Sequence, residues 1–227
     1  MKEAWQIAVL VCLAGFAASP VSASLIVNGD FQSGSTGFGS DYVSSPTQGI
    51  GTDAGTYDVV NNPYGNPPPQ NPFVPPGYYD HTLGTAAGLM LAVNGATDPN
   101  QRVWYENVGG LTVGQQYEFT FWLSNWSFDP VANLQLQIGI GGFQQAGIYA
   151  PEARGVWASE SFLWTATSTS AEFDIFDLQT AAGGNDFALD DISLTAVPEP
   201  ATAMAGVLLL LPLGVSAFRI FRKHRTP

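Results

Sequence analysis

Two short stretches of the chain carry oxygen-bearing side chains of the kind that hold a cation. The first is LIVNGDF, residues 25–31, and the second is GNDFALDDISLT, residues 184–195. In the second stretch Ile192 and Leu194 are the alternating pair expected to face a core, and Asp190 shares their parity, so its carboxylate is predicted to point inward. A buried carboxylate needs a cation or several hydrogen-bond donors, because its desolvation alone is costly. Ca²⁺, which takes oxygen ligands, fits such a position in an acidic protein.

Both stretches also have a plainer interpretation. Asn28-Gly29-Asp30 is a turn sequence, and Asp190 and Asp191 can accept backbone hydrogen bonds without a cation. A calcium site predicts that chelation lowers the melting temperature of residues 24–197. The turn interpretation predicts an unchanged melting temperature, also in an Asp190→Ala variant.

The sequence contains few of the residues that common catalytic mechanisms use. The segment 24–197 has one histidine, His81, and the only cysteine, Cys12, lies outside it. The sequence contains no G-x-S-x-G elbow, no H-E-x-x-H motif and no phosphate-binding loop. Glycoside hydrolysis by a pair of carboxylates remains an alternative, because the spacing of such a pair is set by the three-dimensional fold. We expect a non-enzymatic protein, with a secreted glycan hydrolase or a purely structural matrix protein as alternatives.

Aromatic side chains are the second group that points to a ligand, because sugar rings stack their C–H faces on them. Trp122 lies between Phe121 and Leu123, which alternation assigns to the core, so its ring is predicted to face the other way. The other aromatic residues predicted to contact a ligand are Trp126, Tyr78 and Tyr79. The alternative is that these rings pack against the protein, as most tryptophans do.

Charge limits the partners. The segment from Ser24 to Val197 holds 17 acidic residues and two arginines, Arg102 and Arg154, which gives it a net charge of −15. Nucleic-acid binding requires Lys and Arg to neutralise phosphates, so we expect no nucleic-acid partner.

The elements that position these residues are predicted to be β-strands. Apolar and polar residues alternate in QQYEFTFWLSN, NLQLQIGI and AEFDIFDL, which is typical of strands with one buried face. Further strands are predicted at 25–28, 56–60, 88–93, 102–108, 157–164 and 187–195. About nine short strands separated by turn signals favour an all-β fold. We expect a jelly-roll-type antiparallel β-sandwich over residues 24–196, with a closed barrel as the alternative.

Residues 61–81 break the strand pattern with seven prolines. Proline cannot donate to a strand ladder, so this segment is predicted to be a loop. It either packs its aromatic side chains over the edge of the sandwich or contacts a ligand.

The two acidic stretches, with VGGLTVGQQYEFTFWLSNW between them, resemble the carbohydrate-binding-module and galactose-binding-like β-sandwich superfamily. That fold commonly joins its first and last strands with a structural Ca²⁺. The resemblance implies that Asp190 and Asp30 are calcium ligands. It places Gln32 where the family often has Glu, so this position offers a neutral oxygen. It also implies an extracellular polysaccharide as a possible partner.

Both ends of the chain have the composition of targeting segments. Residues 1–23 contain Lys2, an apolar stretch and Val21 and Ala23 at the −3 and −1 positions of a signal-peptide cleavage site, so a cut after Ala23 by the export machinery is predicted. Residues 201–218 carry no charge and are long enough to span a bilayer core. The basic residues of the tail 219–227 that would keep this end in the cytoplasm are Arg219, Arg222, Lys223 and Arg225.

The triplet Pro198-Glu199-Pro200 directly precedes the apolar span, and the basic tail follows it. This three-part segment, residues 197–227, resembles the PEP-CTERM sorting signal of Gram-negative bacteria. The resemblance implies export through the Sec machinery and a single-pass inner-membrane precursor. It further implies recognition by an exosortase and delivery to the cell surface or the extracellular biofilm matrix.

Overall fold

The computed structural model describes residues 23–45, 53–63, 78–127, 134–149, 153–181 and 183–198, and these segments form ten β-strands. The strands are β1 (Val43–Ser44), β2 (Thr56–Val60), β3 (Met90–Asn94), β4 (Gln101–Gly109), β5 (Gln116–Asn125), β6 (Gln135–Ile140), β7 (Phe143–Tyr149), β8 (Trp157–Thr165), β9 (Ser170–Asp177) and β10 (Asp186–Ala196). No helix is present in the described residues, as expected for an all-β protein.

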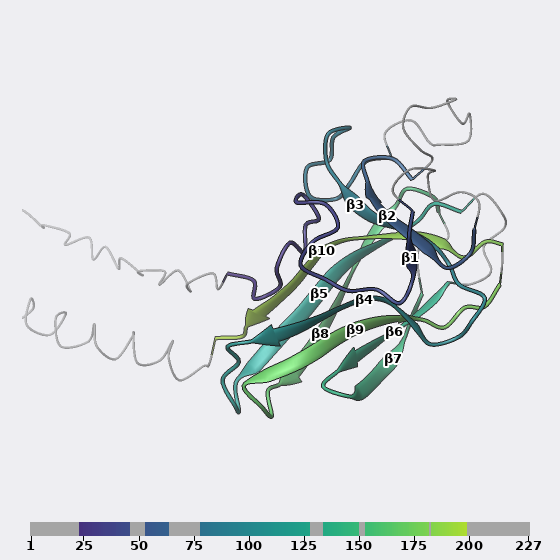
Figure 1. Ribbon diagram of the computed structural model, residues 1–227. Coiled ribbons are helices and arrows are strands. Elements are labelled where there is room, and N and C mark those ends of the chain that lie inside the picture. Colours follow the sequence, from purple (N-terminus) through teal and green to yellow (C-terminus); the bar gives the residue numbers. More distant parts are fainter. Residues whose placement is uncertain are drawn as a thin grey trace, which may run out of the picture. The chain divides into compact units, whose positions relative to one another are not determined.

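The strands form two sheets that pack face to face (Figure 1). One sheet has six strands in the order β1-β2-β3-β10-β5-β8, and the other has four in the order β4-β9-β6-β7. All neighbouring strands are antiparallel except β1 and β2, which are parallel. The last strand, β10, lies between β3 and β5, so the end of the domain is built into the centre of the larger sheet (Figure 1).

The core lies between the two sheets. In β5 the alternating residues Phe119, Phe121 and Leu123 are fully buried, and they belong to one apolar cluster with Phe173 and Ile175 of β9. The rings of Phe119 and Phe173 meet across the interface at a centroid distance of 5.2 Å. This packing of the inner faces is that of a β-sandwich, in agreement with the sequence-based prediction.

The strand predictions are confirmed for eight elements and wrong for one, and two further strands were not predicted. Residues 25–28 do not form a strand, because Ser24 Oγ accepts the Ile26 amide and Asn28 adopts a positive φ of 55°. Two strands were not predicted, β1 and β7. The first has only two residues, and the second is an edge strand with a Gln-Gln pair that breaks the alternation.

A second, smaller apolar cluster covers the outer face of the six-stranded sheet. It contains Ala188 of β10, Ala92 of β3 and the buried rings of Tyr78 and Trp126. Tyr78 comes from the end of the proline-rich segment and stacks on Trp157 of β8, at a centroid distance of 6.3 Å and an interplanar angle of 16°. The described end of this loop therefore packs over the sandwich, while residues 64–77 lie outside the described segments.

Candidate functional site

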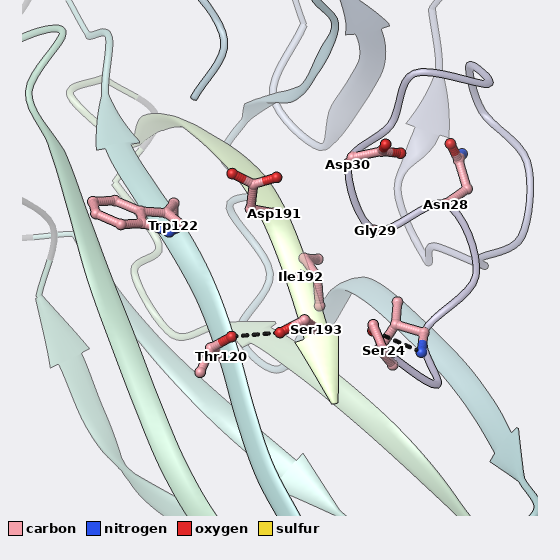
Figure 2. A pocket seen from close by; sticks show the side chains of 10 residues that line it. Ser24, Asn28, Gly29, Asp30, Thr120, Trp122, Asp191, Ile192 and Ser193 are labelled. Atoms are coloured by element: carbon pink, nitrogen blue, oxygen red, sulfur yellow. Dashed lines mark hydrogen bonds between the residues drawn. The ribbon is translucent and has the colours of Figure 1, made fainter. Parts of the chain in front are cut away.

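A pocket of about 470 Å³ opens where the start of the domain meets β5 and β10 (Figure 2). We call it the N-terminal pocket. Its lining consists of Ser24, Ile26, Asn28, Gly29, Asp30, Thr120, Trp122, Asp191, Ile192 and Ser193. Figure 2 shows the loop with Asn28 and Asp30 on one side, Trp122 and Thr120 of β5 on the other, and β10 between them. The volume falls in the range of small-molecule sites, and most lining side chains are polar.

The first wall of the pocket is a loop tied to β10. Leu25 N donates to Leu194 O (2.9 Å), and Ile192 N donates to Gly29 O (2.9 Å). Gly29 approaches β10 so closely that a Cβ atom here would lie 1.8 Å from Ile192 O, so only glycine fits. The Asn28 side chain accepts the Ser33 amide (2.9 Å) and donates to Gly34 O (2.8 Å), which closes the loop. These contacts hold the loop that carries Asp30 at the rim of the pocket, where Asp30 Oδ1 accepts the Gln32 amide (3.2 Å).

The floor of the pocket is shaped by a β-bulge in β10. Asp190 pairs with Trp122 and Ser193 pairs with Thr120, so β10 has one extra residue in this interval. Asp191 occupies it with a positive φ of 48°. Beyond the bulge, the hydroxyl oxygens of Thr120 and Ser193 lie 2.7 Å apart across the two strands.

The bulge corrects the predicted orientation of Asp190. Its side chain is fully buried, as expected, but it lies on the outer face of the six-stranded sheet with Trp122 and not in the sandwich core. The extra residue changes the parity, so Ile192 and Asp190 end on opposite faces although they are two residues apart.

Asp190 and Asp191 hold a short piece of the loop that follows the proline-rich segment. His81 N (2.7 Å), Thr82 N (3.1 Å) and Asp191 N (2.9 Å) donate to the Asp190 carboxylate. Asp191 Oδ2 lies 2.5 Å from His81 Nδ1, and Thr82 Oγ1 donates to Asp191 Oδ1 at 2.6 Å. We call this arrangement the His81–Thr82 clasp. Burial raises the pKa of Asp190 to about 7; the backbone hydrogen bonds act in the opposite direction, and the neighbouring Asp191 charge adds to the rise.

The clasp fixes the ring of Trp122. The His81 imidazole stacks on the indole at a centroid distance of 3.6 Å and an interplanar angle of 17°. Phe121 and Leu123 are fully buried in the core and Trp122 is half-buried on the opposite face, so its predicted orientation is confirmed. The sequence identified His81 as the single histidine of the segment, but no local signal links it to Asp191, 110 residues away.

The other aromatic residues predicted to contact a ligand do not line the N-terminal pocket. Trp126 is 3% exposed and its Nε1 donates to Phe187 O (2.6 Å), so its ring is part of the packing. Tyr78 is 6% exposed and stacks on Trp157. Tyr79 is more exposed, at 38%, and its carbonyl accepts the Trp157 Nε1 hydrogen bond (3.0 Å). Ligand contact stays a prediction, and only Trp122 has a place in the pocket.

The three residues predicted to bind calcium lie in different surroundings. Asp30 lines the pocket, Asp190 lies under the clasp, and Gln32 Nε2 donates to Asp30 O (2.9 Å) and Leu89 O (3.0 Å). The Gln32 amide nitrogen therefore lies between two carbonyl oxygens, where a bound cation would have to lie in order to use them as ligands. In the described segments no group of three or more His, Cys, Asp or Glu side chains is arranged to hold a metal ion. As placed, these residues do not fit a shared calcium site; calcium binding stays a prediction that chelation tests.

The predicted sorting motif lies at the boundary of the described residues. β10 ends at Ala196, and Val197 N still donates to Gln116 O (2.9 Å), so the fold continues up to Pro198. The remaining residues of the predicted signal lie outside the described segments: Glu199, Pro200, Arg219, Arg222, Lys223 and Arg225. The part of the chain that the structure describes contains no helix with the length and hydropathy of a membrane span.

Comparison by sequence finds no matching family model and no curated protein that matches the chain. Comparison by structure finds similar folds. The chain resembles a Stig cyclase, Fisc from Fischerella sp. TAU, solved in complex with (3Z)-3-(1-methyl-2-pyrrolidinylidene)-3H-indole; the two are 14% identical, with 78% of this chain and 98% of the cyclase covered, at a TM-score of 0.52.

Carbohydrate-binding modules are also among the similar structures. TmCBM61, solved with β-1,4-galactotriose, is 15% identical over 78% of this chain and 100% of the module, at a TM-score of 0.49. The CBM22-1 xylan-binding domain of Paenibacillus barcinonensis Xyn10C is 13% identical over 79% of this chain and 94% of that domain, at a TM-score of 0.44. At these identities the likeness concerns the fold, and the function has to be argued from the site itself.

Proposed function

We propose that the chain is an exported, non-enzymatic, jelly-roll-type β-sandwich protein that binds polysaccharide in the N-terminal pocket, at the cell surface or in the extracellular matrix. One observation carries the proposal: the half-buried Trp122, fixed by the His81 stack, stands beside a pocket lined by hydroxyl and carboxylate groups. An aromatic ring that is already immobilised loses little side-chain entropy on binding, and surrounding polar groups orient a ligand by hydrogen bonds.

The hydroxyl groups of the pocket suit a sugar. Ser24 Oγ accepts the amides of Ile26 (3.1 Å) and Leu194 (3.2 Å), so its own proton is available to a ligand oxygen. Thr120 and Ser193 share one hydrogen bond, which leaves the second hydroxyl proton of the pair to donate. The pocket therefore offers donors and acceptors next to one aromatic surface.

The test is glycan binding by the purified full-length chain in detergent. A glycan array should give binding without turnover, and Trp122→Ala should remove most of the signal. Phe143→Ala is the matched control, because Phe143 is an aromatic residue on the other sheet that is 67% exposed. Equal binding by the Trp122→Ala and Phe143→Ala variants would contradict the proposal, and a flat array would favour a purely structural matrix protein.

The proposed route to the surface rests on the sequence of the two ends. Residues 1–23 are the signal peptide, residues 201–218 the membrane span, and Pro198-Glu199-Pro200 the motif that an exosortase recognises. Because Val197 is still hydrogen-bonded to β5, a cut beyond it leaves every strand of the sandwich intact. Intact-mass analysis of protein from membranes and from culture matrix tests this route, since processing predicts a matrix form that begins at Ser24 and ends near Pro200.

A secreted glycan hydrolase is the second candidate, because two carboxylates, Asp30 and Asp191, line the same pocket. Both Asp191 oxygens already contact His81 and Thr82, which favours a supporting role for this residue. Release of reducing sugar that disappears in an Asp30→Asn variant would support the hydrolase, and binding without release supports the binding protein.

A further inference from the structure

We propose that the N-terminal pocket selects amino sugars that carry a free ammonium group over N-acetylated, neutral or anionic sugars. This inference rests on the proposed function and names the class of ligand for the same site.

The charge of the pocket is the first reason. Its lining contains the carboxylates Asp30 and Asp191, and no lysine, arginine or histidine is among the ten lining residues. The whole segment from Ser24 to Val197 holds 17 acidic residues, these two included, against two arginines. Such a field raises the local concentration of cations and repels uronates, sulfates and phosphates.

The charged cluster on the four-stranded sheet shows what a neutralised carboxylate looks like in this protein. There Arg102 donates to Asp41 through Nε (3.0 Å) and Nη2 (2.9 Å), and its Nη1 donates to Glu172 at 3.3 Å. That guanidinium also lies 3.8 Å above the Tyr105 ring. The cluster carries its own cation. At the N-terminal pocket Asp191 is paired with His81, whereas no ion pair to Asp30 is formed among the described residues.

Asp30 is the carboxylate that is free to receive an ammonium group. Asp30 is exposed at the rim. Among the described residues, Gln32 N donates a hydrogen bond to its Oδ1, at 3.2 Å. Asp191 differs, because His81 Nδ1 and Thr82 Oγ1 contact its two oxygens at 2.5 and 2.6 Å. Charge-assisted hydrogen bonds are roughly twice as strong as neutral ones, so Asp30 can discriminate an ammonium from an acetamido group.

The remaining groups suit the rest of a hexosamine unit. Trp122 of β5 lines the same pocket, and because His81 stacks on one face of its indole, a sugar C–H face has to use the other. The Thr120–Ser193 pair lies on the neighbouring part of β5 and β10 for ring hydroxyls (Figure 2). An acetyl group at the amine position would remove the charge and add bulk at the Asp30 rim. Preference for the free amine is therefore expected from both electrostatics and size.

The experiment compares three tetrasaccharides on the full-length chain by isothermal titration calorimetry at pH 6.5 and low salt. They are the glucosamine tetramer, the N-acetylglucosamine tetramer and the galacturonate tetramer. We expect the glucosamine tetramer to bind roughly tenfold more tightly than the N-acetylated one, a difference of about 1.4 kcal/mol. The galacturonate tetramer should not bind, and 200 mM salt should reduce the preference for the free amine.

Asp30→Asn is the diagnostic variant, because it removes the charge from an exposed side chain and keeps its shape. It should bring the ratio of the two affinities close to one. Asp98→Asn is the matched control, since Asp98 is also exposed but lies in the turn before β4, and it should keep the wild-type ratio. Circular dichroism melts of both variants confirm that they are folded.

Each outcome separates this inference from the proposed function. Equal affinity for the free and N-acetylated tetramers, or an unchanged ratio in Asp30→Asn, overturns the ammonium selectivity and leaves sugar binding in place. Binding that survives Trp122→Ala moves the ligand to another site and overturns both. Absence of binding to every tetramer and to the glycan array also overturns both.

Discussion

Two aspartates, Asp177 and Asp190, are both fully buried, yet the protein uses them in different ways. Asp177 accepts hydrogen bonds from Tyr42 Oη (2.8 Å), Asn185 Nδ2 (2.8 Å) and Gln179 N (2.9 Å). Gln179 follows Asp177 by two residues, whereas Tyr42 directly precedes β1 and Asn185 directly precedes β10, and Tyr42 in turn accepts the Ala96 amide at 3.0 Å. Asp177 therefore cross-links the ends of several strands.

Asp190 accepts its hydrogen bonds from His81, Thr82 and its own neighbour Asp191, so among the described residues its carboxylate holds one loop. The held loop carries the imidazole that stacks on Trp122. The same side chain, equally buried, therefore stabilises the fold in one place and preorganises the pocket in the other. Removal of the carboxylate should therefore loosen the whole sandwich at Asp177 and only one loop at Asp190.

The largest effect is expected for Asp177→Ala. The substitution leaves three buried or half-buried donors without an acceptor, which should lower the free energy of unfolding by about 3–4 kcal/mol. Urea denaturation measures the loss. Asp53→Ala, on an exposed turn before β2, is the control and should stay within about 0.5 kcal/mol of wild type. Similar losses in both variants would show that Asp177 is not a cross-link.

Asp190→Ala should cost less, about 2 kcal/mol, because its donors are loop amides that can turn toward water. Hydrogen exchange gives the sharper readout. Amides of residues 81–89 should exchange much faster in this variant while those of β5 and β9 stay protected, whereas Asp177→Ala should raise exchange throughout the sandwich. Uniformly faster exchange in Asp190→Ala would remove the distinction between the two aspartates.

The pH dependence of stability should also distinguish Asp190. Burial raises its pKa to about 7 in the folded state, above the value of about 3.9 of an unfolded chain. The folded state binds the proton more tightly, so this contribution is fully present below pH 4 and is lost as the pH rises through 7. Between pH 5 and 7 the wild type should lose roughly 2 kcal/mol more than Asp190→Asn in urea denaturation. Parallel pH profiles of the two proteins would contradict the raised pKa.

Much of the fold was predictable, because alternation with a period of two directly reports which face of a strand is buried. It placed Phe119, Phe121 and Leu123 in the core and turned Trp122 outward, as the structure has them. The same rule put Asp190 on the wrong face, because it assumes an unbroken ladder. The break is visible in the spacing of Leu189 and Ile192, which are three residues apart and both face the core. That odd spacing is the sequence signal of the bulge.

The candidate site was only partly predictable, because its contacts join distant segments. Asp30 and Trp122 were each singled out for different roles, and the structure places both in one pocket. The pairing of His81 with Asp191 spans 110 residues, and nothing local in the sequence indicates it. Thr120 and Ser193 were missed, because a half-buried hydroxyl on a strand looks the same in sequence whether or not it borders a pocket.

The smallest change in stability is expected for Ser193→Ala, which makes it the cleanest test of a pocket residue. Its hydroxyl pairs with Thr120 Oγ1 at 2.7 Å on a half-buried surface, where water can replace it, so the free energy of unfolding should change by less than about 0.5 kcal/mol. Affinity for the glucosamine tetramer should nevertheless fall about threefold, because the pair loses one donor. Asp177→Ala should show the reverse pattern at a temperature where it is folded, with low stability and wild-type affinity. If calorimetry finds that Ser193→Ala binds as tightly as wild type, the hydroxyl pair is a strand contact only, and sugar recognition falls to Asp30 and Trp122.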